Sequence, residues 1–146
     1  MALFEKILVP LDGSEHSMNA LEKAIQIAKR FDGRITLIHA YSTDLVSLPK
    51  EYTMTEATPE MVEVSRYKGA NILADAQIRA KDQGVQVETL LTAGKAVETI
   101  IETSIDGNFD LIVMGARGLS PIKEILLGSV SHGVTTHAPC PILVVK

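Results

Sequence analysis

Short apolar runs alternate with amphipathic segments along most of the chain. The runs are rich in β-branched residues and four to eight residues long, which is typical of buried strands. They are 5–11, 34–41, 85–92, 110–114 and 141–146. Between them, apolar residues recur at helical spacing, as in Leu21, Ala24, Ile25 and Ala28. The pattern predicts an α/β fold: a doubly wound sheet of about five parallel strands with helices on both faces.

The expected helices have recognisable start and stop signals. Ser14 is a candidate cap for the first helix, which Asp32 and Gly33 should end. The second is predicted over 60–83, with Gly84 as terminator and an inward face made of Ala70, Leu73, Ala74 and Ile78. The third helix should have an inward face made of Val97, Ile100, Ile101 and Ser104 or Ile105. The last helix is expected over about 129–136.

The segment 42–59 breaks this rhythm, because it is polar and contains two prolines. We expect a long connection, with a helical turn around 44–48. Connections of this length are commonly lids, partner surfaces or disordered segments, and the sequence does not say which role applies here.

Composition restricts the function. The net charge is −4 and there is no basic stripe or tryptophan, which argues against a nucleic-acid partner. No apolar run approaches the roughly 18 residues that span a bilayer, and the N-terminus has no secretory signal. We therefore expect a cytoplasmic protein without membrane insertion. The single cysteine, Cys140, lies between two prolines and is interpreted as structural.

A glycine-rich loop follows the fourth expected strand. Its spacing is Gly115-x2-Gly118-x9-Gly128-Ser129, which is neither a Walker A loop nor a GxGxxG fingerprint. A strand that runs into glycines and then into a helix start suits a phosphate, because backbone N–H groups can approach the anion closely. On spacing alone, plain turn chemistry is an equal alternative. In a doubly wound sheet the ligand crevice lies at the carboxyl ends of strands one and four, where we expect the turns 10–12, 93–94 and this loop to converge.

The chain resembles the universal stress protein family, specifically its ATP-binding branch. The segments that carry the resemblance are the glycine loop, ILVPLDGSE, TLIHA, DLIVMGARG and HAPCPILVV. The resemblance covers the whole chain and implies one nucleotide-binding domain over 1–146 with an adenine-nucleotide α-hydrolase-like fold. It also implies a homodimer. The apolar C-terminal strand supports this expectation, since pairing it with a second copy would cover an exposed sheet edge.

The resemblance also implies a nucleotide site. Gly118 and Gly128, with Ser129, Val130 and Ser131, would wrap the phosphates, and the serine hydroxyls would add donors. Met114 and Gly115 would line the ribose or adenine side. The adenine and ribose would also be flanked by Pro10, Leu11, Asp12 and Ala40. The expected ligand is ATP, with ADP or AMP as alternatives, and Asp12 is a candidate for meeting Mg²⁺ through water.

Several of these residues have simpler interpretations. Asp12 is equally a turn residue, Arg117 and Lys123 are equally solvated surface cations, and Ser131 is equally a helix cap. His39 is expected to be packed and hydrogen-bonded rather than catalytic. The histidines at 16, 132 and 137 have no metal-ligand spacing.

Catalytic motifs are missing from the sequence, and only Asp12, Arg117 and Lys123 lie near the loop as candidates. The favoured hypothesis is therefore a regulatory ATP-binding protein with an unidentified protein partner. The alternatives are a slow ATPase, or a phosphotransfer protein that uses Ser129 or Ser131 as acceptor. An interaction module without a ligand is disfavoured by the glycine loop.

Overall fold

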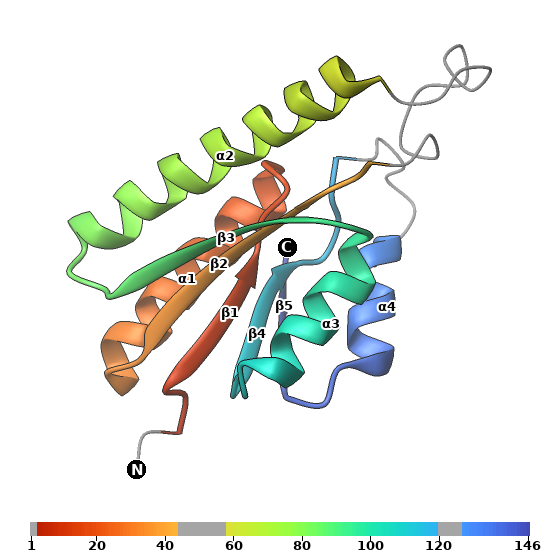
Figure 1. Ribbon diagram of the computed structural model, residues 1–146. Coiled ribbons are helices and arrows are strands. Elements are labelled where there is room, and N and C mark those ends of the chain that lie inside the picture. The colour runs from red at the N-terminus through yellow and green to blue at the C-terminus, as the bar shows by residue number, and fades with distance from the viewer. Residues whose placement is uncertain (1–2, 44–57, 120–126) are drawn as a thin grey trace.

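The computed structural model describes residues 3–43, 58–119 and 127–146 (Figure 1). Strands and helices alternate in the order β1 (Lys6–Pro10), α1 (Glu15–Phe31), β2 (Arg34–Tyr41), α2 (Pro59–Asp82), β3 (Val87–Ala93), α3 (Ala96–Asp106), β4 (Leu111–Gly115), α4 (Ser129–His137) and β5 (Ile142–Val145). The strands form one sheet in the order β3-β2-β1-β4-β5, and every neighbouring pair is parallel. The predicted doubly wound α/β fold is confirmed.

Two hydrophobic cores lie on opposite faces of the sheet. Successive side chains of β1 alternate between them: Ile7 and Val9 pack with α1 and α2, whereas Leu8 packs with α3 and α4. All three side chains are fully buried. Because both faces are covered, the central strands are continuously apolar, which is the pattern that the sequence displays.

The helix starts follow from local side-chain chemistry. Ser14 caps α1 as predicted, since its hydroxyl accepts a hydrogen bond from the Ser17 N–H at 3.2 Å. Thr58 caps α2 by accepting from the Met61 N–H, and Pro59 occupies the first helical position. Pro59 therefore belongs to α2 rather than to the preceding connection, because a proline fits the first turn of a helix without losing a hydrogen bond.

The predicted inward face of α2 is partly wrong, whereas that of α3 is largely confirmed. In α2 the buried residues are Gly69, Leu73, Ala76 and Ala80, whereas Ala74 and Ile78 are exposed. In α3 Ile100 is buried as predicted, and of the two alternatives Ser104 is buried whereas Ile105 is 53% exposed; Thr99 is buried as well. In α2 small residues face the sheet because space there is limited. A Cβ at Gly69, for example, would collide with the His39 ring.

The segment 44–57 and residues 120–126 lie outside the described residues, so the expected turn around 44–48 and the expected role of Lys123 stay predictions. The edge strands are β3 and β5, which confirms the predicted edge position of the C-terminal strand. Among the described residues no helix is long and apolar enough to cross a membrane.

Cys140 is partly buried and packs against the core on the α3 and α4 side. Burial raises the pKa of its thiol, and the nearby Asp110 carboxylate raises this pKa further, whereas a backbone hydrogen bond opposes the shift. The thiol is therefore protonated at neutral pH and is a poor nucleophile, which agrees with the structural interpretation.

Candidate functional site

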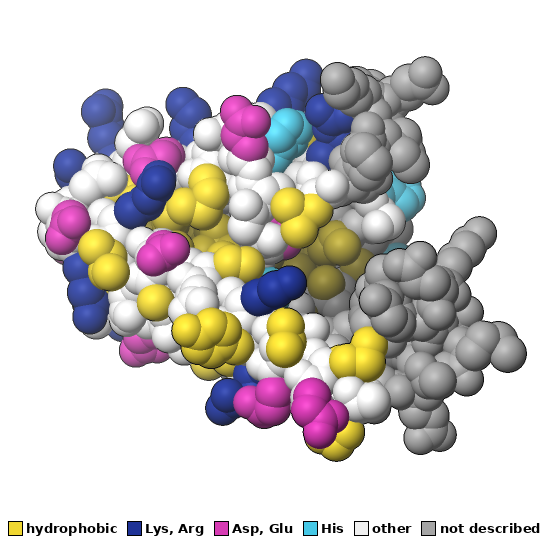
Figure 2. All heavy atoms as spheres, turned by 90° about the horizontal axis from the view of Figure 1, so that it is seen from above, with side chains coloured by type: hydrophobic (Ala, Val, Ile, Leu, Met, Phe, Trp, Pro, Cys, Tyr) yellow, Lys and Arg dark blue, Asp and Glu magenta, His cyan; other side chains and the backbone are white. Residues whose placement is uncertain are grey.

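A pocket lies at the carboxyl ends of β1 and β4. These strands are neighbours, with Ile7 opposite Leu111 and Leu8 opposite Ile112, and the chain leaves them toward opposite faces of the sheet. Such a switch point leaves a crevice between the two outgoing connections. Here it forms a cavity of about 270 Å³. Seen from this end, the molecule has a hollow with a hydrophobic floor (Figure 2).

Every residue that the sequence predicted for the site lines this one pocket. They come from three separate parts of the chain and are Pro10, Leu11, Asp12, Ala40, Met114, Gly115, Arg117, Gly118, Gly128, Ser129, Val130 and Ser131. Lining a pocket is a placement, so their binding roles stay predictions.

Six further residues line the pocket and were not predicted: Ser17, Ile38, His39, Ala96, Ile100 and Leu119. The sequence spacing could have indicated three of these residues. Ile38 lies two residues before Ala40 and so shares its face of the strand. Ala96 and Ile100 are four apart and share one face of α3. The turn 93–94 itself does not line the pocket; the helix that follows it does.

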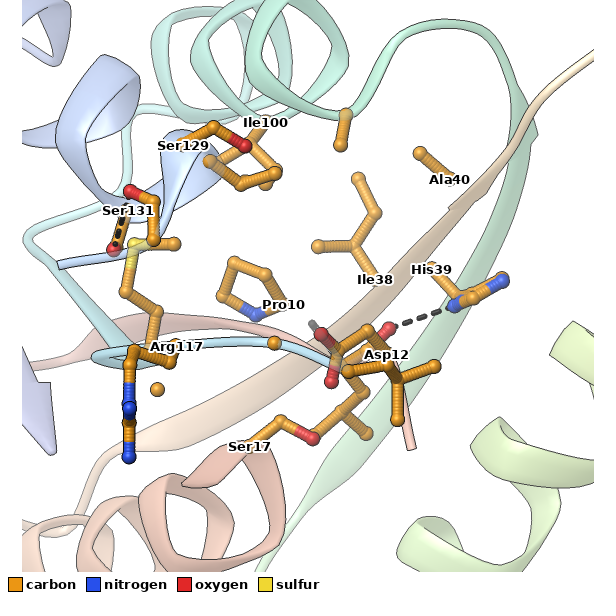
Figure 3. Close-up of a pocket in the computed structure, with 18 residues that line it drawn as sticks. Pro10, Asp12, Ser17, Ile38, His39, Ala40, Ile100, Arg117, Ser129 and Ser131 are labelled. Carbon is orange, nitrogen blue, oxygen red and sulfur yellow. Dashed lines mark hydrogen bonds between the residues drawn. The ribbon is translucent and has the colours of Figure 1, made fainter. Parts of the chain in front are cut away.

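One side of the pocket is apolar. Pro10, Ile38 and Ala40 lie along the ends of β1 and β2, and Ile100 of α3 faces them across the cavity (Figure 3). Ile38 and Ile100 are 1% and 3% exposed, so both belong to the hydrophobic core and are fixed in place. This side is suited to a flat, apolar ligand group.

The two carboxylate oxygens of Asp12 have different surroundings: one accepts a hydrogen bond from the backbone, and the other faces the pocket. Its Oδ1 accepts a hydrogen bond from the Ser14 N–H at 2.9 Å, which is an Asx turn and supports the interpretation of Asp12 as a turn residue. Its Oδ2 faces Gly118, where a Cβ would lie only 2.5 Å from that oxygen. A side chain at 118 would therefore displace the Asp12 carboxylate, so this carboxylate and the start of the loop meet across the cavity.

The helix α4 starts at the opposite side of the pocket. Its N-cap is Gly128, which has no side chain with which to cap the helix. The first helical hydrogen bond runs from the His132 N–H to the Gly128 carbonyl at 2.9 Å. The N–H groups of Ser129, Val130 and Ser131 precede it in the first turn, where helices have no partner of their own for these donors. Such a helix start favours anions.

The Ser131 hydroxyl has a structural role, and its predicted phosphate contact stays a prediction. Ser131 is 2% exposed, and its Oγ donates to the Ala116 carbonyl at 2.6 Å. The Gly128 N–H donates to the same carbonyl at 2.7 Å, so the two bonds fasten the start of α4 to the end of β4. Ser131 is also not the helix cap, which is Gly128. Ser129, in contrast, is exposed at the pocket.

Two histidines hold backbone groups around the pocket. The His39 Nδ1 bonds the Leu11 carbonyl at 2.7 Å, which confirms the predicted packed and hydrogen-bonded role. The His16 Nδ1 accepts from the Arg117 N–H at 3.3 Å. The Arg117 side chain extends away from Ile38 and Ala40 (Figure 3). It is therefore remote from the apolar side of the pocket.

Among the described residues, no three His, Cys, Asp or Glu side chains form a group that could hold a metal ion. Asp12 is a single carboxylate. This arrangement can bind a ligand with an apolar end and an anionic end, and a metal here would need most of its ligands from water and from a bound phosphate.

Comparisons with known proteins agree with this geometry. Residues 3–146 match the sequence profile of the Universal stress protein family. The chain belongs to this family. It is 33% identical to the universal stress protein YxiE of Bacillus subtilis (strain 168) over 148 aligned residues, covering 99% of this chain and all of that protein.

Solved structures of universal stress proteins share the fold. The protein UspA from Lactobacillus plantarum superposes with a TM-score of 0.85 at 23% identity, covering 98% of each chain. A universal stress protein solved in complex with cAMP has a TM-score of 0.71 at 28% identity, covering 100% of this chain and 98% of that one.

Proposed function

We propose that this universal stress protein binds an adenine nucleotide, with ATP as the preferred ligand, and acts as a regulatory switch. The observation that carries the proposal is the pairing of an apolar pocket with the uncapped start of α4. Its two ends match the two chemical parts of a nucleotide, an aromatic base and a chain of phosphates. The relative that is solved with cAMP supports the choice of an adenine nucleotide.

The base would lie against Ile38, Ala40 and Ile100. Ile38 and Ile100 are held by the core, so the apolar slot exists before the ligand arrives and little entropy is lost in forming it. Met114 and Gly115 at the end of β4 would then border the ribose or the base, as would Pro10 and Leu11 at the end of β1.

The phosphates would lie between Gly118 and the first turn of α4. The N–H groups of Ser129, Val130 and Ser131 supply donors with the favourable end of the helix dipole. Gly118 leaves the room that the phosphates need beside Asp12. The exposed Ser129 hydroxyl would add a donor, whereas the Ser131 hydroxyl would act indirectly, by holding the helix start in position.

Asp12 would hold Mg²⁺, if the nucleotide brings it, through bound water. The geometry fits this role because Oδ2 faces the loop while Oδ1 is occupied by the Ser14 N–H. Mg²⁺ supplies charge neutralisation to the phosphates and commonly keeps several waters.

A regulatory protein fits better than a fast enzyme. Among the described residues only Asp12 and Arg117 are charged groups that line the pocket. Phosphoryl transfer needs a clamp of cations and a group that orients the nucleophile. The second candidate function is slow ATP hydrolysis or autophosphorylation. In that case Ser129 is the better candidate for the phosphate acceptor, because its side chain is exposed whereas that of Ser131 is buried.

The proposal extends to the assembly. The edge strand β5, Ile142–Val145, would pair with the same strand of a second copy across a two-fold axis, since an apolar edge is otherwise a site of aggregation. The homodimer would act in the cytoplasm on a protein partner that the sequence and fold do not identify. A monomer at micromolar concentration in sedimentation would contradict this part.

The first test is to denature freshly purified protein and identify the released nucleotide by chromatography against standards. We expect ATP at close to one per chain. Release of ADP or AMP would favour the slow hydrolase. A protein that is empty and also fails to take up ATP at millimolar concentration would overturn nucleotide binding and leave the fold unaffected.

The second test separates switch from enzyme. Purified protein is incubated with ATP, and ADP release is compared with that of the Asp12→Ala variant. We expect turnover near background for both. Fast release that disappears in the variant would assign catalysis to Asp12, and phosphoserine that disappears in a Ser129→Ala variant would assign autophosphorylation to Ser129.

A further inference from the structure

The helix α2 has a second apolar face, which points away from the sheet. Val64, Tyr67 and Ile78 are 54%, 68% and 58% exposed, and Ala74 is exposed on the same side. The sheet-facing residues are Gly69, Leu73, Ala76 and Ala80. At about 100° per residue, the exposed set lies about 180° from the buried set on the helix. We call the four exposed residues the outer stripe.

The outer stripe is accessible along its whole length. The helix contacts β2 and β3 on its inner side and runs along the outside of the molecule (Figure 1). From Val64 to Ile78 the stripe spans about 21 Å. It lies over the β3 side of the sheet, so it is far from the β5 edge and leaves the pocket at β1 and β4 unobstructed.

We propose that the outer stripe is a self-association surface on which α2 of a second copy packs antiparallel. With the two-fold axis next to Asn71, residues equally far before and after it meet across the interface. Val64 is seven residues before this position and Ile78 is seven after it. Tyr67 is four before and Ala74 is three after, so a bulky ring meets a small side chain.

The charges beside the stripe select a second copy as the occupant. Lys68 and Asp75 are exposed on one flank, three residues before and four after the axis. Glu63 and Lys81 are exposed on the other flank, eight before and ten after. The antiparallel arrangement thus places opposite charges together on both flanks, each pair occurring twice, whereas Glu60 and Asp82, eleven residues before and after the axis, meet as like charges at the two ends of the stripe. A parallel pair would instead place the Lys68 and Asp75 flank of one copy beside the Glu63 and Lys81 flank of the other, so these two pairs would not form.

The size of the surface predicts weak binding. One face of a helix of 24 residues is about 36 Å long and about 10 Å wide, a footprint of about 360 Å². A stable interface buries about 800 Å² per partner. The association should therefore be reversible and visible only at high concentration. Because α2 and β5 lie at opposite edges of the sheet, it can occur in addition to pairing through β5 and does not depend on the proposed function.

The test is sedimentation velocity at low salt, from about 10 µM to 1 mM protein. Wild type should form a larger species at the upper end, and Ile78→Glu should abolish it by placing a charge in the stripe. Any smaller species, including a dimer through β5, should be identical in both proteins. ATP binding, or the thermal unfolding midpoint if no nucleotide binds, verifies that each variant is folded.

The charge pairs allow a sharper experiment. Lys68→Glu and Asp75→Lys should each weaken the association by about tenfold, since two attractive contacts become repulsive. A one-to-one mixture of these two variants should regain it, because every contact in the mixed pair is again between opposite charges. Identical sedimentation of wild type and Ile78→Glu, or no recovery on mixing, would overturn the proposal, even where another protein binds the stripe.

Discussion

The helices α1 and α4 both begin at the edge of the sheet where the pocket lies, but their first turns are completed differently. At α1 side chains of the protein itself accept hydrogen bonds from two backbone N–H groups. The Ser14 hydroxyl accepts from the Ser17 N–H, and the Asp12 carboxylate accepts from the Ser14 N–H at 2.9 Å. The start of α1 therefore has its own side-chain cap.

At α4 the corresponding position is Gly128, which offers no side chain. The hydrogen bonds around it use the Gly128 N–H and the Ser131 hydroxyl to fix the helix start to the Ala116 carbonyl. This difference between the two helix starts indicates which of them is suited to bind an anion. A capped start stabilises the fold, whereas a rigidly held but uncapped start leaves its donors to a ligand.

The largest effect is expected when α4 is given the cap that α1 has. In Gly128→Asp, the carboxylate would occupy the amide donors and repel phosphate, so ATP affinity should fall by about 100-fold while adenosine affinity changes little. Calorimetric titration measures both. Gly128→Ala is the matched control, because it adds the same Cβ without the charge. Equal losses in the two variants would show that only space matters there.

The next effect comes from closing the gap between the two helix starts. Gly118→Val would fill the space in front of Asp12 Oδ2 and should lower ATP affinity by about 30-fold through overpacking. Gly118→Ala should have a smaller effect in the same direction. Unchanged affinity in the valine variant would place the phosphates elsewhere.

A smaller effect separates the two serines of α4. Ser131→Ala removes the buried bond to Ala116, so the free energy of unfolding should fall by about 1 kcal/mol and ATP affinity by about fivefold. Ser129→Ala is the matched control, because its hydroxyl is exposed; its free energy of unfolding should be unchanged. Denaturant unfolding and titration give both quantities. A stable Ser131→Ala protein would contradict the fastening role.

The smallest effect on binding is expected at α1. Ser14→Ala should lower the free energy of unfolding by about 1 kcal/mol, the usual cost of losing a helix cap, and leave ATP affinity within about twofold. If affinity instead fell as far as in Gly128→Asp, the contrast between the two helix starts would not hold.

Much of the fold and the position of the site could be predicted from the sequence. Buried parallel strands have continuous apolar runs, and the crevice of a doubly wound sheet follows from strand order. Residues such as Asp12 and Gly118 are far apart in sequence but end at the same edge, so the placement of the predicted lining was correct.

The rest depended on packing that no local pattern encodes. Leu73 was predicted inward correctly, but Ile78 faces outward because the small residues Gly69 and Ala76 fit the space against the sheet. The bond of the Ser131 hydroxyl to the Ala116 carbonyl could not be predicted, since nothing in the sequence shows that this carbonyl lies beside it. Ile100 was predicted inward, but its position at the pocket depends on how α3 lies across the sheet.

The most direct test of the account is a comparison of backbone amide NMR shifts during titration with ATP and with adenosine. We expect ATP, but not adenosine, to move the amide signals of Ser129, Val130 and Ser131 strongly, because only the phosphates reach the start of α4. The amides of Glu15 and His16 at the start of α1 should move little with either ligand. Large ATP-specific shifts at α1 with none at α4, or the same α4 shifts with both ligands, would contradict the claim that the uncapped helix start is the phosphate site.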